Sequence, residues 1–271
     1  MLDRNNPKLA QLVEAVHASR KYRHVSEVFI SSIGTRELER GESLKEAIKA
    51  TKNKLHQVGA AFLDDEMPYA SWLEELRLAA RSGDRQTLRD ACARIMLHQS
   101  STRERLPILD QFYPTILADL PPVHTLLDVA CGLNPLAIPW MPLAAHATYY
   151  AYDIYQDMMD FLNACMRIFE VEGQAQARDV IQSPPQQKVD LALILKALPC
   201  IEQVDKFAAL HLLSEINADH LLISFPAQSL GGRRRGMAVN YEARFRALLA
   251  GKDWSIKRFE FASELAFLIT K

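Results

Sequence analysis

The residues best suited to chemistry lie in one stretch, from His124 to Asp153. An apolar segment runs into the turn 128–135, whose one glycine is Gly132. A helix and a second apolar segment follow, and that segment ends at Asp153. A glycine lets the backbone approach a ligand closely, and an acid about twenty residues further on can accept from both hydroxyls of a ribose. This order indicates a site for an adenosine-containing ligand.

The turn alone is weak evidence, because a single glycine does not make a GxGxxG dinucleotide fingerprint. Asn134 followed by Pro135 is also a good N-cap and first-turn pair, so the loop could simply start a helix. The position of Asp153, at the end of the next strand, favours the nucleoside site over this alternative.

Two further polar positions follow predicted strands. Asp179 and Val180 come after a strand-like segment at 174–178, where an aspartate can accept from an adenine amino group. An exposed turn residue is an equally good interpretation of Asp179. Lys196 ends the apolar run 189–195, so its ammonium group should point into the mouth of the crevice or reach solvent.

A cationic loop joins the segment that ends at Pro226 to a helix near Tyr241. It contains Arg233, Arg234 and Arg235 between glycines, and it should lie at the edge of the sheet where ligands bind. Three arginines on a glycine-rich loop suit RNA phosphates or a base edge, whereas the alternative is a loop that only aids solubility.

The charge is segregated along the chain of 271 residues, although its formal net charge is only −1. Residues 1–60 carry 11 Lys and Arg against 7 Asp and Glu, and residues 227–258 carry 8 against 2. The net charge argues against a uniformly basic nucleic-acid binder, yet two separated basic regions suit a phosphate-rich partner. Solvated helix surfaces are the alternative.

The four cysteines are widely spaced and make no CxxC pair, so neither a zinc site nor a disulfide framework is expected. The scattered histidines also lack metal-ligand spacing. The polar amino terminus lacks the apolar core of a signal peptide, and no apolar run approaches the ~20 residues that a membrane span requires. These features predict a soluble cytoplasmic protein without a bound metal.

Two structural regions are expected, with a boundary at residue 120. Residues 1–120 show helical periodicity, and Ser43 with Glu46 forms a capping-box pattern before one of the helices. Residues 121–271 alternate strands with helices, which predicts an α/β fold with a doubly wound, mostly parallel sheet. The predicted strands are 125–129, 148–152, 174–178, 189–195, 221–225, 254–259 and 265–270, and the last two must pair antiparallel because a short turn separates them.

The chain resembles the aminoglycoside-resistance 16S ribosomal RNA methyltransferases that modify N7 of guanine 1405. The resemblance covers almost the whole chain. It is carried, in order, by Ser19–Tyr22, Lys54–Ala60, Ser101–Leu106, Asp128–Leu136, Ser224–Pro226, Ser229–Arg233, Gly236-Met237 and Asn240-Tyr241. One departure lies at Gln99 and Ser100, which together separate His98 from Ser101-Thr102 where the family pattern has a single residue.

The resemblance implies a class I methyltransferase fold, with a Rossmann-like sheet closed by an antiparallel hairpin, and S-adenosylmethionine as the methyl donor. The residues implied at the cofactor are Gln99, Ser100, Ser101, Arg105, Ala130, Gly132, Asp153, Ile154, Asp179, Val180 and Leu195. Arg105 is implied at the cofactor's carboxylate, and Gln99, Ser100 and Ser101 are alternatives there. Asp179, Lys196, Glu202 and Arg233 are implied to position the target base.

The resemblance also makes the amino-terminal helices a docking domain for the 30S subunit, on which the protein would act as a monomer. The docking residues expected are Arg20, Lys21, Arg23, Lys52 and Lys54, with Arg233, Arg234 and Arg235 also on the RNA. Three alternatives stay open: a methyltransferase of another ribosomal or transfer RNA position such as adenine N1, an inactive cofactor-binding RNA module, and a small-molecule methyltransferase.

Overall fold

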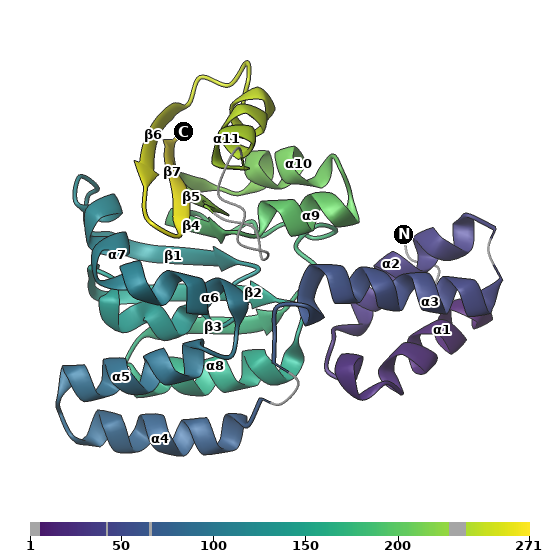
Figure 1. Ribbon diagram of the computed structural model, residues 1–271, viewed down its shortest axis with the longest axis horizontal. Helices are drawn as coiled ribbons and strands as arrows, with labels where there is room; N and C mark the ends of the chain where they lie inside the picture. The colour runs from purple at the N-terminus through teal and green to yellow at the C-terminus, as the bar shows by residue number, and fades with distance from the viewer. Residues whose placement is uncertain (1–5, 42, 65–66, 228–236) are drawn as a thin grey trace.

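A seven-stranded sheet organises the carboxy-terminal half of the chain (Figure 1). The computed structural model describes residues 6–41, 43–64, 67–227 and 237–271, except for the side chains of 237–239. The strand order is β3-β2-β1-β4-β5-β7-β6. The strands are β1 (Val123–Val129), β2 (Leu143–Asp153), β3 (Glu172–Ala177), β4 (Val189–Leu195), β5 (Ala218–Pro226), β6 (Ser255–Glu260) and β7 (Glu264–Thr270).

Strands β1 to β5 pair parallel, and β7 pairs antiparallel with both β5 and β6. The predicted doubly wound sheet and its antiparallel hairpin are therefore confirmed. The hairpin inserts β7 beside β5 and leaves β6 at the edge, which places Glu264, the first residue of β7, opposite Pro226 at the carboxyl end of β5.

Both faces of the sheet are covered, which explains the uninterrupted apolar strand at 189–195. Leu191 and Leu193 pack into the core on one face, and Ala192 and Ile194 pack into the core on the other. Helices α9 (Leu198–Val204), α10 (Ala208–Glu215) and α11 (Met237–Leu248) cover one face, and α8 (Gln156–Ile168) lies on the opposite face (Figure 1). This burial on both faces is typical of parallel sheets.

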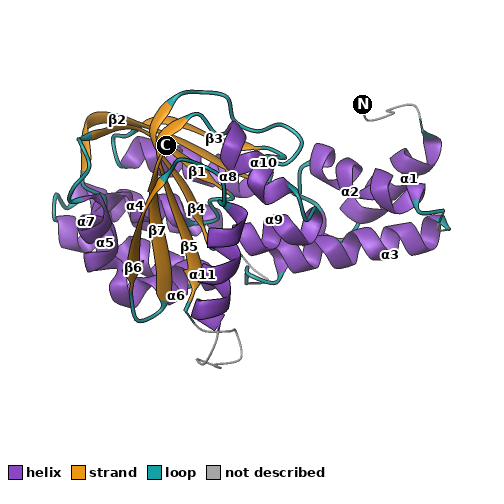
Figure 2. Cartoon of the chain, turned by 90° about the horizontal axis from the view of Figure 1, so that it is seen from above, coloured by secondary structure: helices purple, strands orange, loops and turns teal. Residues whose placement is uncertain are grey.

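The helices before residue 120 fall into two groups. The first is α1 (Pro7–His17), α2 (Glu27–Glu39) and α3 (Leu44–Leu55), which pack on one another and project beyond the carboxyl ends of the strands (Figures 1 and 2). The second is α4 (Tyr69–Arg81) and α5 (Arg85–Met96), which pack against α8 and the 3₁₀ helix η4 (Asn134–Trp140), with α6 (Ser100–Arg105) and α7 (Leu109–Leu117) continuing toward β1.

Local sequence signals explain several helix ends. Ser43 accepts from the backbone amide of Glu46, and the Glu46 carboxylate accepts in return from the backbone amide of Ser43, so the capping box is confirmed. Two helices, α9 and α10, lie between β4 and β5, and α10 begins at Ala208. A π-helical turn, η2 (His56–Ala60), joins α3 to the rest of the chain.

In the described ranges, no helix has both the length and the apolar character that crossing a membrane requires. The same ranges hold no cluster of three or more metal-ligating side chains. All four cysteines are free thiols.

Candidate functional site

A cavity of about 340 Å³ opens at the carboxyl ends of the parallel strands. Most of the residues implied at the cofactor line it: Gln99, Ser100, Ser101, Ala130, Asp153, Ile154, Asp179, Val180 and Leu195. Lys196 lines it as well. The sheet topology brings these residues together, because the turns that follow β1, β2, β3 and β4 all meet at this edge. This is the edge at which open α/β sheets bind ligands.

The turn after β1 is held in an uncommon backbone conformation. Ala130 has φ of 52° and Gly132 has φ of 50°, in the left-handed region that costs residues with a Cβ atom. The Gln99 side chain lies so close to Gly132 that an added Cβ would fall 1.8 Å from its Nε2 atom. Gln99 also accepts from the backbone amide of Leu133 at 2.8 Å. The glycine thus allows Gln99 to hold this turn in place.

Asp153 closes the same turn from β2. One carboxylate oxygen accepts from the backbone amide of Gly132 at 2.8 Å, and the other accepts from the amide of Ile154 at 2.6 Å. Burial raises the pKa of Asp153, and these two hydrogen bonds oppose that rise. Each carboxylate oxygen has a second lone pair, so Asp153 can still accept from two hydroxyl groups in the cavity.

Asp179 lines the cavity, and one of its carboxylate oxygens is unsatisfied. Its Oδ1 atom accepts from the backbone amides of Ile181 and Gln182, whereas Oδ2 is buried without a hydrogen-bond partner in the structure. Burial raises the pKa of this carboxyl as well. An unpartnered buried oxygen carries a desolvation cost that a donor would relieve, so Oδ2 fits an amino group such as that of adenine. The side chains present therefore fit an adenosine-containing cofactor.

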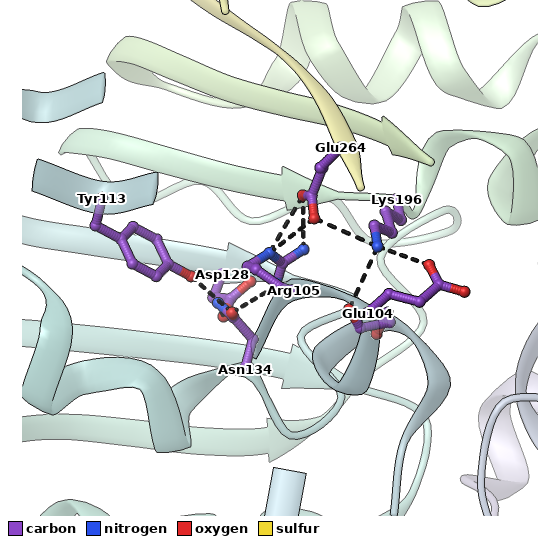
Figure 3. Close-up of polar contacts among 8 residues, drawn as sticks. Glu104, Arg105, Tyr113, Asp128, Asn134, Lys196 and Glu264 are labelled. Carbon is purple, nitrogen blue, oxygen red and sulfur yellow. Dashed lines mark hydrogen bonds and ion pairs between the residues drawn. The ribbon is translucent and has the colours of Figure 1, made fainter. Parts of the chain in front are cut away.

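Lys196 lies where β4 ends and also has a left-handed backbone, with φ of 59°. Its ammonium group contacts the carboxylate of Glu104 at 2.8 Å and that of Glu264 at 3.3 Å (Figure 3). Only 7% of the Lys196 side chain is exposed. Two carboxylates therefore compensate its charge, and the cation forms part of the cavity wall rather than reaching solvent.

Arg105 lies behind that wall, not in it. Its guanidinium group donates to both carboxylate oxygens of Glu264, at 2.8 to 3.2 Å, and to Oδ1 of Asn134 at 2.9 Å (Figure 3). Arg105 is buried and is absent from the residues that line the cavity. The guanidinium group thus links β7 to η4. Of the residues implied at the carboxylate of the cofactor, Gln99, Ser100 and Ser101 line the cavity.

Asn134 does not cap a helix as its position before Pro135 suggested. Its amide nitrogen donates to Asp128, and its oxygen accepts from Arg105 and from the Tyr113 hydroxyl. Tyr149 donates to the same oxygen of Asp128. Burial raises the pKa of Asp128 to about 6, although these donors oppose the rise. Asn134, the first residue of η4, therefore belongs to a buried polar network.

One of the residues implied at the target base, Glu202, is not part of the cavity wall. Glu202, on α9, is not among the cavity-lining residues, although its neighbours Ile201 and Gln203 are. Its carboxylate accepts instead from Arg244 of α11 at 2.9 Å. Arg233, with Arg234 and Arg235, lies outside the described residues.

The expected docking residues separate into two environments. Arg20, Lys21 and Arg23 line a second cavity of about 550 Å³ between the α1–α3 helices and the rest of the chain. Lys52 donates to the Ser19 hydroxyl at 2.6 Å, and Lys54 donates to the backbone oxygen of Gln203 at 2.8 Å. Lys54 therefore connects α3 to α9.

Sequence reasoning missed Glu264 and several cavity residues contributed by the helices before residue 61. The available signal for Glu264 was a lone acid at the start of the apolar strand ELAFLIT. Val58 and Gly59 of the π-helical turn and Phe29 of α2 also line the cavity. No sequence pattern predicts that residues so far from the strands in sequence lie at this edge of the sheet.

We expect Glu264→Gln to destabilise the protein strongly. Glu264 is fully buried and faces two cations, so its neutralisation leaves Arg105 and Lys196 undercompensated, which costs about 3–5 kcal/mol for a broken buried pair. Denaturant unfolding of the two proteins measures the loss.

Glu104→Gln is the matched control, because Glu104 contacts the same ammonium group but is 36% exposed. Solvent screens this pair, so the control should lose less than about 1 kcal/mol. Equal losses in the two variants would contradict the central role of Glu264.

Comparison with known proteins agrees with this geometry. A family model described as a ribosomal RNA methyltransferase (FmrO) matches residues 18–268. A 16S rRNA (guanine(1405)-N(7))-methyltransferase of Micromonospora rosea is 34% identical over 97% of both chains. One of Frankia casuarinae is 36% identical over 95% of this chain and 92% of the relative.

A solved structure has the same fold over nearly the whole length. The 16S rRNA methyltransferase RmtF, crystallised with S-adenosyl-L-homocysteine, superposes with a TM-score of 0.82 at 27% identity, covering 98% of this chain and 99% of that one. Sequence, family model and fold agree from the amino-terminal helices to the final hairpin. The chain therefore belongs to the FmrO family of ribosomal RNA methyltransferases.

Proposed function

We propose that this protein transfers a methyl group from S-adenosylmethionine to N7 of guanine 1405 in 16S ribosomal RNA, and so confers aminoglycoside resistance. The observation that carries the proposal is the pair of buried carboxylates, Asp153 and Asp179, that face one cavity in a member of this family. Relatives over nearly the full length bear the name of this activity.

The cavity residues suggest how the cofactor is held. Asp153 would accept from the ribose hydroxyls, and Asp179 with Val180 would bind the adenine through a carboxylate oxygen and an apolar contact. Ala130, Ile154 and Leu195 would line the pocket, and the turn at Gly132 would support it. Gln99, Ser100 and Ser101 would face the methionine carboxylate. When bound, S-adenosylmethionine supplies an electrophilic methyl group on a sulfonium cation.

The target atom needs no general base, because guanine N7 has an in-plane lone pair that is unprotonated at neutral pH. Catalysis then depends mainly on in-line orientation of the two reactants. Asp179, Lys196, Glu202 and Arg233 would act by positioning. The carboxylates of Glu104 and Glu264 compensate the charge of Lys196, so its ammonium group can lie beside a sulfonium cation without strong repulsion.

Reaching N7 requires the RNA to be distorted. In A-form RNA the edge that carries N7 lies in a deep, narrow groove that side chains cannot read, so the base must be extruded or the helix opened. Extrusion costs a few kcal/mol, which phosphate contacts elsewhere can offset. We propose that the helices of residues 1–120 supply such contacts to the assembled 30S subunit, that the carboxy-terminal domain of residues 121–271 performs the transfer, and that the enzyme is a cytoplasmic monomer.

Methylation of purified bacterial small subunits with tritiated S-adenosylmethionine tests the proposal. We expect incorporation of one methyl group, and borohydride and aniline treatment should cleave the RNA at guanine 1405, because this treatment detects N7-methylguanine. Cells that express the protein should also tolerate kanamycin and gentamicin. A reverse-transcription stop at a nearby adenine without aniline cleavage would indicate N1 methylation instead, and absence of incorporation would indicate an inactive RNA-binding module.

The affinity for S-adenosylhomocysteine should depend on pH through Asp153. Burial raises the pKa of this carboxyl, and the ribose hydroxyls bind its ionised form, so protonation competes with binding. Affinity should therefore fall as the pH is lowered from 7.5 toward 5, earlier than for an ordinary aspartate. Calorimetry of the wild type and Asp153→Asn measures this.

The Asp153→Asn variant should bind about 10- to 150-fold more weakly at pH 7.5, from the loss of charge-assisted hydrogen bonds. Its affinity should also change less with pH than that of the wild type. Parallel pH profiles for the two proteins would argue against Asp153 as the ribose acceptor.

Charge reversal tests the docking surface. The triple variant Arg20→Glu, Lys21→Glu, Arg23→Glu should bind small subunits at least about tenfold more weakly at 150 mM salt, with a shallower salt dependence, because fewer phosphate counterions are released. Filter binding with labelled subunits measures both quantities. Binding of S-adenosylhomocysteine should not change.

The control reverses Arg167, near the end of α8, and Lys188, which precedes β4; both are exposed at the opposite edge of the sheet and lie outside the two basic regions. These substitutions should leave subunit binding within about twofold of the wild type. If the triple variant binds as the control does, the α1–α3 helices are not the docking surface.

A further inference from the structure

One half of the cavity remains once the adenosine moiety is assigned to the turns after β2 and β3. Its walls come from the residues that follow β4 and β5, the two neighbouring strands at the centre of the sheet: Lys196, Pro199, Pro226 and Tyr241. A methyl acceptor must enter from this side, because the other half is taken by the nucleoside. The chemistry of these walls therefore bears on how the acceptor is held.

Tyr241 presents a rigid aromatic surface in this half. Its ring stacks on Phe225 with centroids 5.1 Å apart and an interplanar angle of 21°. Phe225 is buried and packs edge-on against Phe245 and Phe267. Tyr241 itself is half-buried and lines the cavity. One face of its ring thus rests on a fixed aromatic cluster, and the side chain is preorganised before any substrate binds.

The other aromatic side chains in the cavity wall are placed differently. Phe29 and Phe62 come from the amino-terminal helical region, and Tyr155 follows β2 at the nucleoside half. The ring of Tyr152 lies under the guanidinium group of Arg178, 5.1 Å from its centroid, and its hydroxyl accepts from Gln187. Tyr241 is thus an aromatic side chain that borders the half left for the acceptor.

An ion pair between two helices lies one helical turn from Tyr241. Arg244 follows it by three residues on α11, on the same side of the helix, and donates to Glu202 of α9 at 2.9 Å. Glu202 does not line the cavity, but its two neighbours do. The Glu202–Arg244 pair thus ties α11 to the helix that forms the adjacent wall.

We propose that Tyr241 is a stacking platform for the extruded target base, with Glu202 and Arg244 as positioning residues that hold it over the cavity. This role rests on the proposed methyl transfer to a guanine of the RNA. An unpaired purine has two large π faces, and aromatic side chains bind such faces without hydrogen-bond readout. Stacking would align the purine plane and leave its N7 edge free to face the methyl group.

Substitution of Tyr241 separates stacking from packing. In methylation of small subunits, Tyr241→Leu should lower kcat/KM by about 5- to 150-fold, the range measured when aromatic residues that stack on bases are removed. Tyr241→Phe and Tyr241→Trp, which keep a ring, should restore most of the activity that Tyr241→Leu loses. The affinity for S-adenosylhomocysteine should be the same in all of these proteins.

Phe245→Leu is the matched control, because Phe245 packs on the same Phe225 ring but does not line the cavity. It should lower the melting temperature without lowering kcat/KM at a temperature where the protein stays folded. Equal losses of kcat/KM in Phe245→Leu and Tyr241→Leu, an equal loss in Tyr241→Phe, or weaker cofactor binding in Tyr241→Leu would each overturn the stacking role. A wild-type protein that does not methylate the subunit would instead refute the proposed function itself.

Discussion

The fully buried carboxylate of Glu264 is the interaction on which the rest of the site depends. It receives a bidentate pair from Arg105 and a contact from Lys196, so a single side chain joins β7, α6 and the end of β4. A buried carboxylate is costly by itself. Burial would raise the pKa of Glu264, but the charges of Arg105 and Lys196 outweigh burial and lower it. The last strand of the sheet is thereby tied to the wall of the cavity.

Contacts to neighbouring elements let two residues beside the cavity keep an unfavourable backbone. Ala130 and Lys196 end neighbouring strands with positive φ, which costs of order 1–3 kcal/mol for a residue that is not glycine. Such a conformation persists only where its surroundings fix it. Glu264 and Glu104 hold the Lys196 side chain, and the amide of Cys131, next to Ala130, donates to the backbone oxygen of Tyr152. Among the described residues, two of the four non-glycine positions with positive φ thus lie in the cavity wall.

The sequence predicted the parts of the fold that depend on local pattern. Alternation of strands and helices fixed the sheet type, and strand ends located Asp153, Asp179 and Lys196, because parallel strands bring their carboxyl ends to one edge. It could not predict the partner of Arg105, since Glu264 lies 159 residues away in sequence and only the pairing of β7 with β5 brings it near. The partners of Asn134 could not be predicted for the same reason, because its side chain joins a buried network with residues distant in sequence.

The amino-terminal helices are more than an attachment to the sheet, because they reach the cavity itself. Lys54 and Arg36 donate to backbone oxygens near the end of α9, at Gln203 and Val204 respectively, and the π-helical turn places Gly59 in the cavity wall. Helices proposed to grip the ribosome are thus in direct contact with the helix that borders the proposed base site. If RNA binding changes the affinity for the cofactor by some factor, thermodynamic reciprocity requires that cofactor binding change the RNA affinity by the same factor. The two activities share one wall, so they cannot be independent unless that wall is rigid.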